Sequence, residues 1–131
     1  MSGPRLLYID DEKDLLELAA SFFEDENFEV TTCSDFRRAL ELVKNNHFDV
    51  IITDEKMPSG SGIEFIKMIN EENVYTGRVI LVTGNLRELT GDEEKLIQDV
   101  MFKPICFQTL IEKVRAVTSS AQEQLGSGQT P

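Results

Sequence analysis

Residues 49–54 read DVIITD, and this stretch decides the fold class. Its centre is continuously apolar and β-branched, a pattern typical of a strand that is covered on both faces. Such strands occur in mainly parallel sheets, where helices pack on either side. The acidic residue that ends the stretch lies where the strand is expected to meet a loop.

Short apolar strands and amphipathic helices alternate along the rest of the chain. The period of the hydrophobic pattern predicts helices between the strands and after the last one. We expect strands at 6–9, 28–32, 49–53, 78–82 and 100–102, and a loop at 57–62. Alternation repeated five times implies a mainly parallel sheet with helices on both faces.

Polar residues mark the expected beginnings of three helices. Ser34 is a plausible N-cap for the second helix, and Ser61 followed by Glu64 has capping-box spacing at the start of the third. The fourth helix is the weakest, because Thr90-Gly91-Asp92 has the pattern of a fresh helix start rather than of a helix interior. We therefore expect the fourth helix, around residues 85–92, to be short, broken or mobile.

The composition describes an acidic globular chain of 131 residues with a formal net charge of −11. Such a charge argues against a nucleic-acid surface and against binding to an anionic membrane. No stretch has the pattern of a signal peptide or the roughly 20 apolar residues of a membrane span. We therefore expect a cytoplasmic protein without membrane insertion, in which Cys33 and Cys106 are reduced.

Five polar residues follow directly after predicted strands: Asp10, Asp11, Asp54, Thr83 and Lys103. Each alone has an ordinary explanation, such as helix capping, a turn or a solvated charge. Together they meet at one edge of a parallel sheet, where three carboxylates would repel one another unless a cation binds. Hard oxygen ligands suit Mg²⁺, which favours bound phosphate. Because no phosphate-binding glycine loop is present, a donor would have to present the phosphoryl group to a carboxylate.

Four motifs, each placed after a predicted strand, carry a family resemblance. They are residues 9–12 (IDDE), 54–58 (DEKMP) with Gly62, 82–84 (VTG) and 103–104 (KP). The set resembles the receiver domains of bacterial two-component response regulators over residues 5–118. The resemblance implies a flavodoxin-like five-stranded parallel sheet in the order 2-1-3-4-5 with helices on both faces. Residues 1–4 would then be an N-terminal extension, and residues 119–131 a flexible tail or linker.

The resemblance also implies a signalling role rather than turnover of an external substrate. Asp54 would accept a phosphoryl group from a histidine kinase or a histidine phosphotransfer protein. Thr83 and Lys103 would contact phosphoryl oxygens, and the changed surface would address a downstream effector. A homodimer through the last helices is a further option.

The same resemblance implies a metal site for Mg²⁺, with Mn²⁺ as an alternative. Asp11, Asp54 and the main-chain carbonyl of Lys56 would bind the cation directly. Asp10 would act mainly through a metal-bound water. Lys56 and Asn85 occupy positions that would tune the lifetime of the phosphoryl group.

Val100 departs from the family pattern, which places Tyr or Phe three residues before the lysine. This departure leaves open a pseudo-receiver, with the same fold used only as a protein-protein interaction module. A Mg²⁺-dependent phosphatase with an aspartyl nucleophile is disfavoured, because Lys56 stands where such enzymes carry a second aspartate. The complete acidic set favours the phospho-acceptor.

Overall fold

A five-stranded parallel sheet forms the centre of this computed structural model, which describes residues 3–84 and 90–127 without the side chains of residues 119–127. The sheet order is β2-β1-β3-β6-β7, and every neighbouring pair is parallel. The bounds are β1 (Arg5–Ile9), β2 (Glu29–Cys33), β3 (Val50–Asp54), β6 (Arg78–Thr83) and β7 (Asp99–Phe102). This is the expected order 2-1-3-4-5, because β4 (Lys56–Met57) and β5 (Gly60–Ser61) form a separate hairpin.

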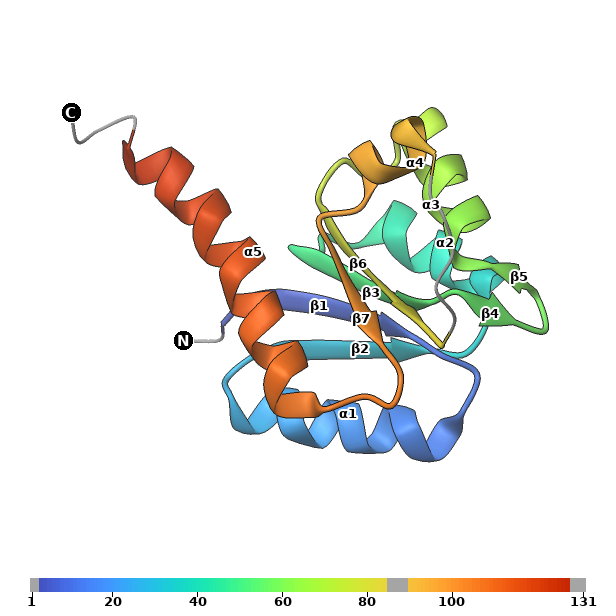
Figure 1. Ribbon diagram of the computed structural model, residues 1–131, viewed down its shortest axis with the longest axis horizontal. Coiled ribbons are helices and arrows are strands. Elements are labelled where there is room, and N and C mark those ends of the chain that lie inside the picture. Colours follow the sequence, from blue (N-terminus) through green and yellow to red (C-terminus); the bar gives the residue numbers. More distant parts are fainter. Residues whose placement is uncertain (1–2, 85–89, 128–131) are drawn as a thin grey trace.

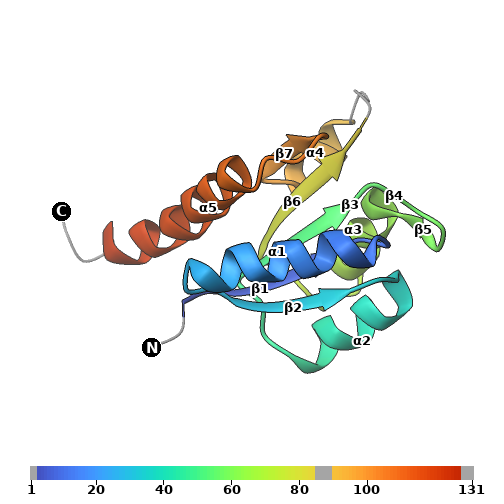
Figure 2. The ribbon, with the colours of Figure 1, turned by 90° about the horizontal axis from the view of Figure 1, so that it is seen from below.

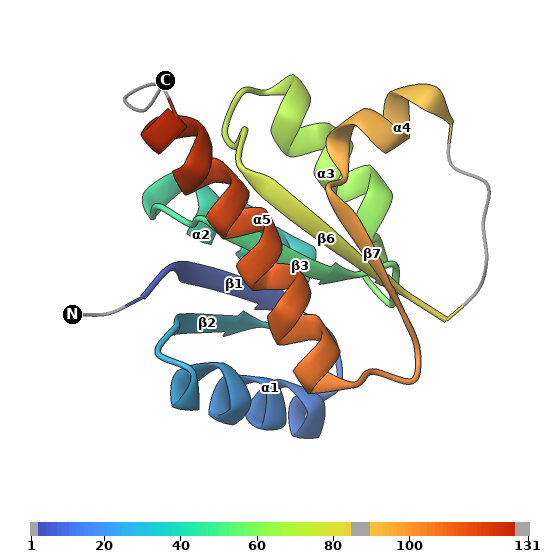
Figure 3. The same ribbon diagram turned by 60° about the vertical axis from the view of Figure 1, so that its left-hand side comes forward.

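The five helices in the described part of the chain cover the two faces of the sheet unequally. Helices α1 and α5 pack on one face, and α2, α3 and α4 pack on the other (Figures 2 and 3). Their bounds are α1 (Lys13–Asp25), α2 (Phe36–Asn45), α3 (Gly62–Glu71), α4 (Gly91–Leu96) and α5 (Phe107–Ser127). The expected layering of helices on both faces is therefore confirmed.

Side-chain alternation along the strands divides the core between the two faces. Tyr8 and Ile52 point toward α1 and α5, where they meet Phe23 and Leu110. The intervening residue Ile51 packs on the opposite face, against α2 and α3. Strands buried on both faces account for the continuous apolar runs that the sequence displays.

Two of the three expected helix caps are confirmed. The hydroxyl of Ser61 accepts the Glu64 N–H at the start of α3, and Thr90 forms a reciprocal capping box at the start of α4. The assignment of Ser34 is wrong, because the side chain of Asp35 accepts the Arg38 N–H at 2.8 Å. Asp and Ser are about equally good caps, so backbone geometry decides between adjacent candidates. Helix α4 begins at Gly91, as the pattern Thr90-Gly91-Asp92 indicates, and is short, with six residues. Residues 85–89 of the expected segment lie outside the described residues.

The segment expected as a loop at 57–62 contains a small hairpin. Lys56 pairs with Ser61 and Met57 with Gly60, whose φ of 141° suits glycine. Such two-residue strands lack the length that a periodic pattern needs to be recognised. In Figure 1 the parallel strands point toward the side of the molecule that carries this hairpin, so their carboxyl ends share one edge.

The last helix runs past the expected domain boundary at residue 118 and ends at Ser127. A linker role for residues 119–131 stays a prediction. Among the helices that the structure describes, none is long and apolar enough to cross a membrane. The expected cytoplasmic location also stays a prediction.

Gly62, the first residue of α3, offers a test of how tightly the start of this helix packs against the end of β3. A Cβ atom there would lie 2.5 Å from the main-chain oxygen of Asp54 and 3.2 Å from a methyl carbon of Leu81. Because the first contact is with backbone, Gly62→Ala should lower the free energy of unfolding by about 1–3 kcal/mol. Urea unfolding measures this loss.

Gly91→Ala is the matched control, because a Cβ atom on Gly91 would meet nothing within 4 Å. This substitution lies in the first turn of α4 and should be neutral or stabilise the protein by up to about 1 kcal/mol. Equal effects of the two substitutions would contradict the close packing of Gly62 against Asp54.

Candidate metal and phospho-acceptor site

Three carboxylates meet at the carboxyl edge of the sheet, as the sequence predicts. One oxygen from each of Asp10, Asp11 and Asp54 lies within 4.8 Å of the others. Asp10 and Asp54 are buried, with exposed fractions of 1% and 4%, whereas Asp11 is exposed. The cluster therefore opens to solvent on the side of Asp11.

Asp10 is held by main-chain hydrogen bonds on either side. Its N–H donates to the carbonyl of Cys33 at 3.0 Å, which continues the β1–β2 ladder by one residue. Its Oδ1 atom accepts the Glu12 N–H at 2.9 Å. Glu12 is the N-cap of α1, and its own side chain makes no capping hydrogen bond. Neither Asp10 nor Asp11 is therefore the N-cap residue of α1.

The environment of Asp10 favours its neutral form. Burial, together with the charges of Asp54 and Asp11, raises the pKa of Asp10 to about 6, against the opposing effects of the Glu12 N–H and of Lys103. The other oxygen, Oδ2, is buried and has no hydrogen-bond partner among the described residues. A cation, or water bound to one, would supply the missing interaction.

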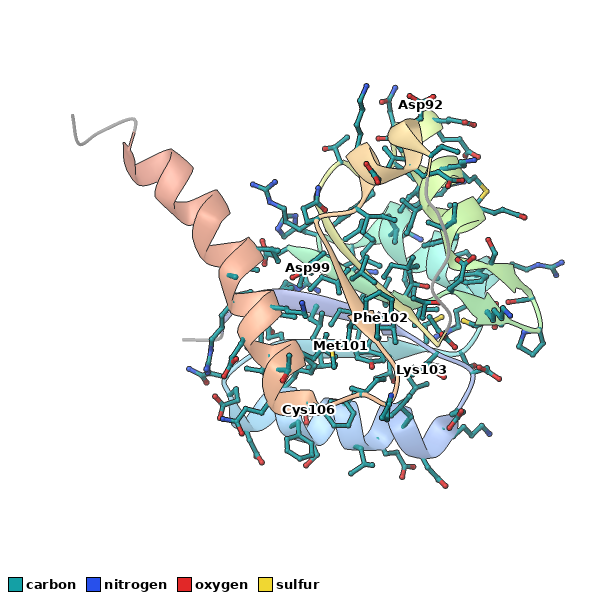
Figure 4. All side chains as sticks on the ribbon, viewed as in Figure 1. Asp92, Asp99, Met101, Phe102, Lys103 and Cys106 are labelled. Atoms are coloured by element: carbon teal, nitrogen blue, oxygen red, sulfur yellow. The ribbon has the colours of Figure 1, made fainter. Side chains whose placement is uncertain are left out.

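Lys103 follows directly after the end of β7, where Figure 4 labels it. Its Nζ atom lies 3.2 Å from both carboxylate oxygens of Asp54. Burial lowers the pKa of Lys103, but the hydrogen bond to Asp54 and the charges of Asp54, Asp10 and Glu12 raise it more. The ammonium is therefore retained, and it offsets one of the three negative charges.

Thr83 lies at the end of β6, buried and next to the lysine loop. The main-chain oxygen of Thr83 accepts the Lys103 N–H at 2.9 Å. This bond extends the β6–β7 ladder, in which Thr83 pairs with Phe102. A main-chain hydrogen bond thus links Thr83, which carries the predicted hydroxyl, to Lys103, which carries the predicted ammonium.

Glu55 is a structural member of the site that the sequence analysis missed. Its N–H donates to Val82, its carbonyl accepts the Gly62 N–H, and both bonds are 2.8 Å long. Its Oε1 atom accepts the Ile63 N–H at 3.0 Å. Glu55 therefore joins β3, β6 and the start of α3. From sequence alone, an acidic side chain such as that of Glu55 is expected to be exposed to solvent. No local sequence pattern therefore predicts its hydrogen bonds to β6 and α3.

The structure says less about the other positions that the sequence analysis singled out. Lys56 lies in β4 with an exposed side chain, and its main-chain role stays a prediction. Asn85 lies outside the described residues. Val100 pairs with Leu81 and is half-buried, so the position expected to carry an aromatic ring holds a small aliphatic side chain. Met101 is buried and Phe102 is half-exposed, as strand alternation predicts.

The residues fit a hard divalent cation. Three carboxylates supply oxygen ligands, the cluster is open on the side of Asp11, and Oδ2 of Asp10 is a buried acceptor without a donor in the described part of the chain. This group of carboxylates contains neither cysteine nor histidine, which disfavours soft metals.

The fold and this acidic edge define a doubly wound α/β domain with its ligand site at the carboxyl ends of the strands. The family described as "Response regulator receiver domain" matches residues 6–115. The chain therefore belongs to the receiver-domain family of response regulators, and the family resemblance of its motifs is confirmed.

Individual relatives agree with this assignment. The chain is 27% identical to the transcriptional regulatory protein TcrA of Mycobacterium tuberculosis, over 90% of this chain and 47% of TcrA. The Francisella response regulator 1452 receiver domain superposes with a TM-score of 0.82 at 28% identity, covering 91% of this chain and 99% of that structure. The response regulator TrrA of Thermotoga maritima, solved in complex with Mg²⁺-BeF, superposes with a TM-score of 0.77 at 26% identity. The match covers 88% of this chain and 99% of the TrrA chain.

Family membership establishes the general role. Receiver domains bind Mg²⁺ at an acidic pocket, interact with histidine kinases and are regulatory units rather than turnover enzymes. The chain spans about half or less of the length of the curated relatives it matches. The transcriptional regulation named for relatives such as TcrA therefore describes those longer proteins. The expected absence of direct nucleic-acid binding stays a prediction for this chain.

The raised pKa of Asp10 predicts a pH-dependent cost to the metal-free protein. Its ordinary pKa is near 3.8, so between about pH 4 and pH 6 the folded state binds the proton more tightly than the unfolded state. The carboxylate therefore destabilises the fold above this window. Asp10→Asn should raise the free energy of unfolding at pH 7.5, in EDTA, by about 1–3 kcal/mol.

This gain should shrink as the pH falls from 6 toward 4, because the folded wild-type protein then carries Asp10 in its neutral form and no longer buries a charge there. Urea unfolding at pH 7.5, 6 and 4.5 measures the trend. Asp25→Asn, at an exposed position near the end of α1, is the control and should show no such dependence. A less stable Asp10→Asn protein at pH 7.5 would contradict the cost assigned to the buried charge.

Proposed function

We propose that Asp54 of this receiver domain accepts a phosphoryl group from the phosphohistidine of a histidine kinase or a histidine phosphotransfer protein. The observation that carries this proposal is the convergence of Asp10, Asp11, Asp54 and Lys103 at one edge. In the transfer, the P–N bond of the donor breaks and a P–O bond to a carboxylate oxygen of Asp54 forms. The released imidazole takes a proton.

Asp11 and Asp54, with the main-chain carbonyl of Lys56, would hold Mg²⁺ directly, and Asp10 would hold a metal-bound water. When bound, the cation supplies positive charge for the phosphoryl oxygens in the transition state. The related TrrA domain was solved as a Mg²⁺-BeF complex, which supports the same ion here. Mn²⁺ has similar ligand preferences and is an alternative.

Lys103 and Thr83 are proposed to bind the phosphoryl oxygens after transfer. The Lys103 ammonium lies 3.2 Å from Asp54 and can move its contact from carboxylate to phosphoryl oxygen. A hydroxyl rotates freely to donate to a new acceptor, which suits Thr83. Because the Lys103 N–H donates to the Thr83 carbonyl, both responses act on the same β6–β7 connection.

Mass spectrometry after incubation with a small phosphodonor and Mg²⁺ tests the proposal. We expect one added phosphoryl group on the wild-type protein and none on Asp54→Asn. Asp25→Asn, which changes an exposed carboxylate on α1, is the matched control and should be modified like the wild type. An unmodified wild-type protein would contradict the proposal and favour a pseudo-receiver that acts only by binding other proteins.

The side chain of Lys56 is proposed to influence the lifetime of the phosphoryl group, because it is exposed two residues after Asp54. Lys56→Ala should change the rate of autodephosphorylation by about threefold or more, where threefold is equivalent to less than about 1 kcal/mol. As a surface substitution it should change the free energy of unfolding by only about 0.5 kcal/mol. Decay of the phosphorylated mass measures the rate, and equal lifetimes would contradict this role.

A further inference from the structure

Tyr8 lies beneath the acidic cluster, in the strand that delivers Asp10. It is two residues before Asp10 on β1 and pairs with Ile52, which is two residues before Asp54 on β3. Because side chains two apart point to the same face of a strand, Tyr8 lies one row below both carboxylates, about 6–7 Å along the strands. Its ring packs against Phe23 of α1, with the ring centroids 6.4 Å apart.

The hydroxyl of Tyr8 is a buried polar group that makes no hydrogen bond to the described residues. Tyr8 is 1% exposed, and its Oη atom has no hydrogen-bond partner in residues 3–84 and 90–118. Burial, and then the charges of Asp10 and Asp54, raise the pKa of this hydroxyl. It therefore keeps its proton and can act as a hydrogen-bond donor. A buried donor without an acceptor is costly.

Of the two acceptors whose charges act on this hydroxyl, Asp54 is already engaged, because both of its oxygens contact Lys103. Oδ1 of Asp10 accepts the Glu12 N–H. Oδ2 of Asp10 is buried and, in the described chain, has no donor. A cation could satisfy this oxygen, but it could not accept a proton from Tyr8. The two unpartnered atoms, one donor and one acceptor, are complementary.

We propose that Tyr8 is a positioning residue of the metal site, whose hydroxyl holds Oδ2 of Asp10 through one bridging water and so orients this carboxylate for the cation. The inference rests on the proposed function, because it assigns the support of the same site. A bridging water satisfies both atoms where no direct bond forms, and a carboxylate oxygen can accept a second hydrogen bond. Partners that orient metal ligands typically contribute about 10–100-fold to metal affinity.

Two tyrosine-to-phenylalanine variants separate this role from simple core packing. Both keep the ring and remove one hydroxyl, that of Tyr8 or that of Tyr75, which donates to the Arg78 carbonyl at 3.0 Å. Isothermal titration with Mg²⁺ should show about tenfold weaker binding for Tyr8→Phe. Tyr75→Phe should bind Mg²⁺ within about twofold of the wild type, because its hydroxyl lies outside the acidic cluster.

A spectroscopic test does not depend on the folding of Tyr8→Phe. The chain has no tryptophan and two tyrosines, so Tyr8 is the remaining tyrosine in Tyr75→Phe. Saturating Mg²⁺ should change the near-ultraviolet absorbance of this variant, because the hydrogen bond of the Tyr8 phenol changes when Asp10 is engaged. A ring that only fills the core would give no metal-induced change.

The outcomes distinguish this inference from the proposed function. If wild type and Tyr8→Phe bind Mg²⁺ equally, or if the absorbance of Tyr75→Phe is unchanged, the role of Tyr8 is overturned while the metal site stands. If the wild-type protein binds no Mg²⁺, the proposed function fails as well. Weaker binding by Tyr8→Phe together with the absorbance change supports the assignment.

Discussion

Electrostatic repulsion among three carboxylates is the constraint on which the structure of this site depends. Asp10, Asp11 and Asp54 bring oxygens within 4.8 Å of one another, and two of these side chains are buried. Like charges at this distance disfavour the folded state unless opposing charges or hydrogen bonds compensate. The ammonium of Lys103 and the N–H of Glu12 supply part of this compensation. A divalent cation is the natural source of the rest.

The sheet can hold this unfavourable arrangement because its strands are fixed from both sides. The central strand β3 is buried along its whole length and pairs with β1 and β6. Glu55 then ties the end of β3 to β6 and to α3, and Gly62 lies against the main chain of Asp54. Burial of apolar surface on both faces thus stabilises a strand end whose own charges oppose folding.

Sequence reasoning succeeded where a hydrophobic pattern was long enough to identify an element and its end. The apolar runs placed the five main strands, and the parallel arrangement placed Asp10, Asp54 and Lys103 at a shared edge. It failed where geometry acts over one or two residues: Asp35 instead of Ser34 caps α2, and a hairpin replaces the expected loop at 57–62. Tyr8 could have been noticed, because it precedes Asp10 by one strand period, whereas the contacts of Glu55 required coordinates.

The net charge of the acidic cluster indicates the order in which a cation and a phosphodonor would bind at the proposed site. Three carboxylates and one ammonium leave the metal-free cluster with a formal charge of −2, on a chain whose net charge is −11. An anionic phosphoryl group approaching this edge is repelled, and the effect is strongest where burial lowers the local dielectric. A divalent cation brings the cluster to neutrality, so metal binding should precede productive approach of the donor. If Asp54 accepts a phosphoryl group as proposed, side chains that orient the carboxylates for the cation would act on the transfer without touching the phosphoryl group.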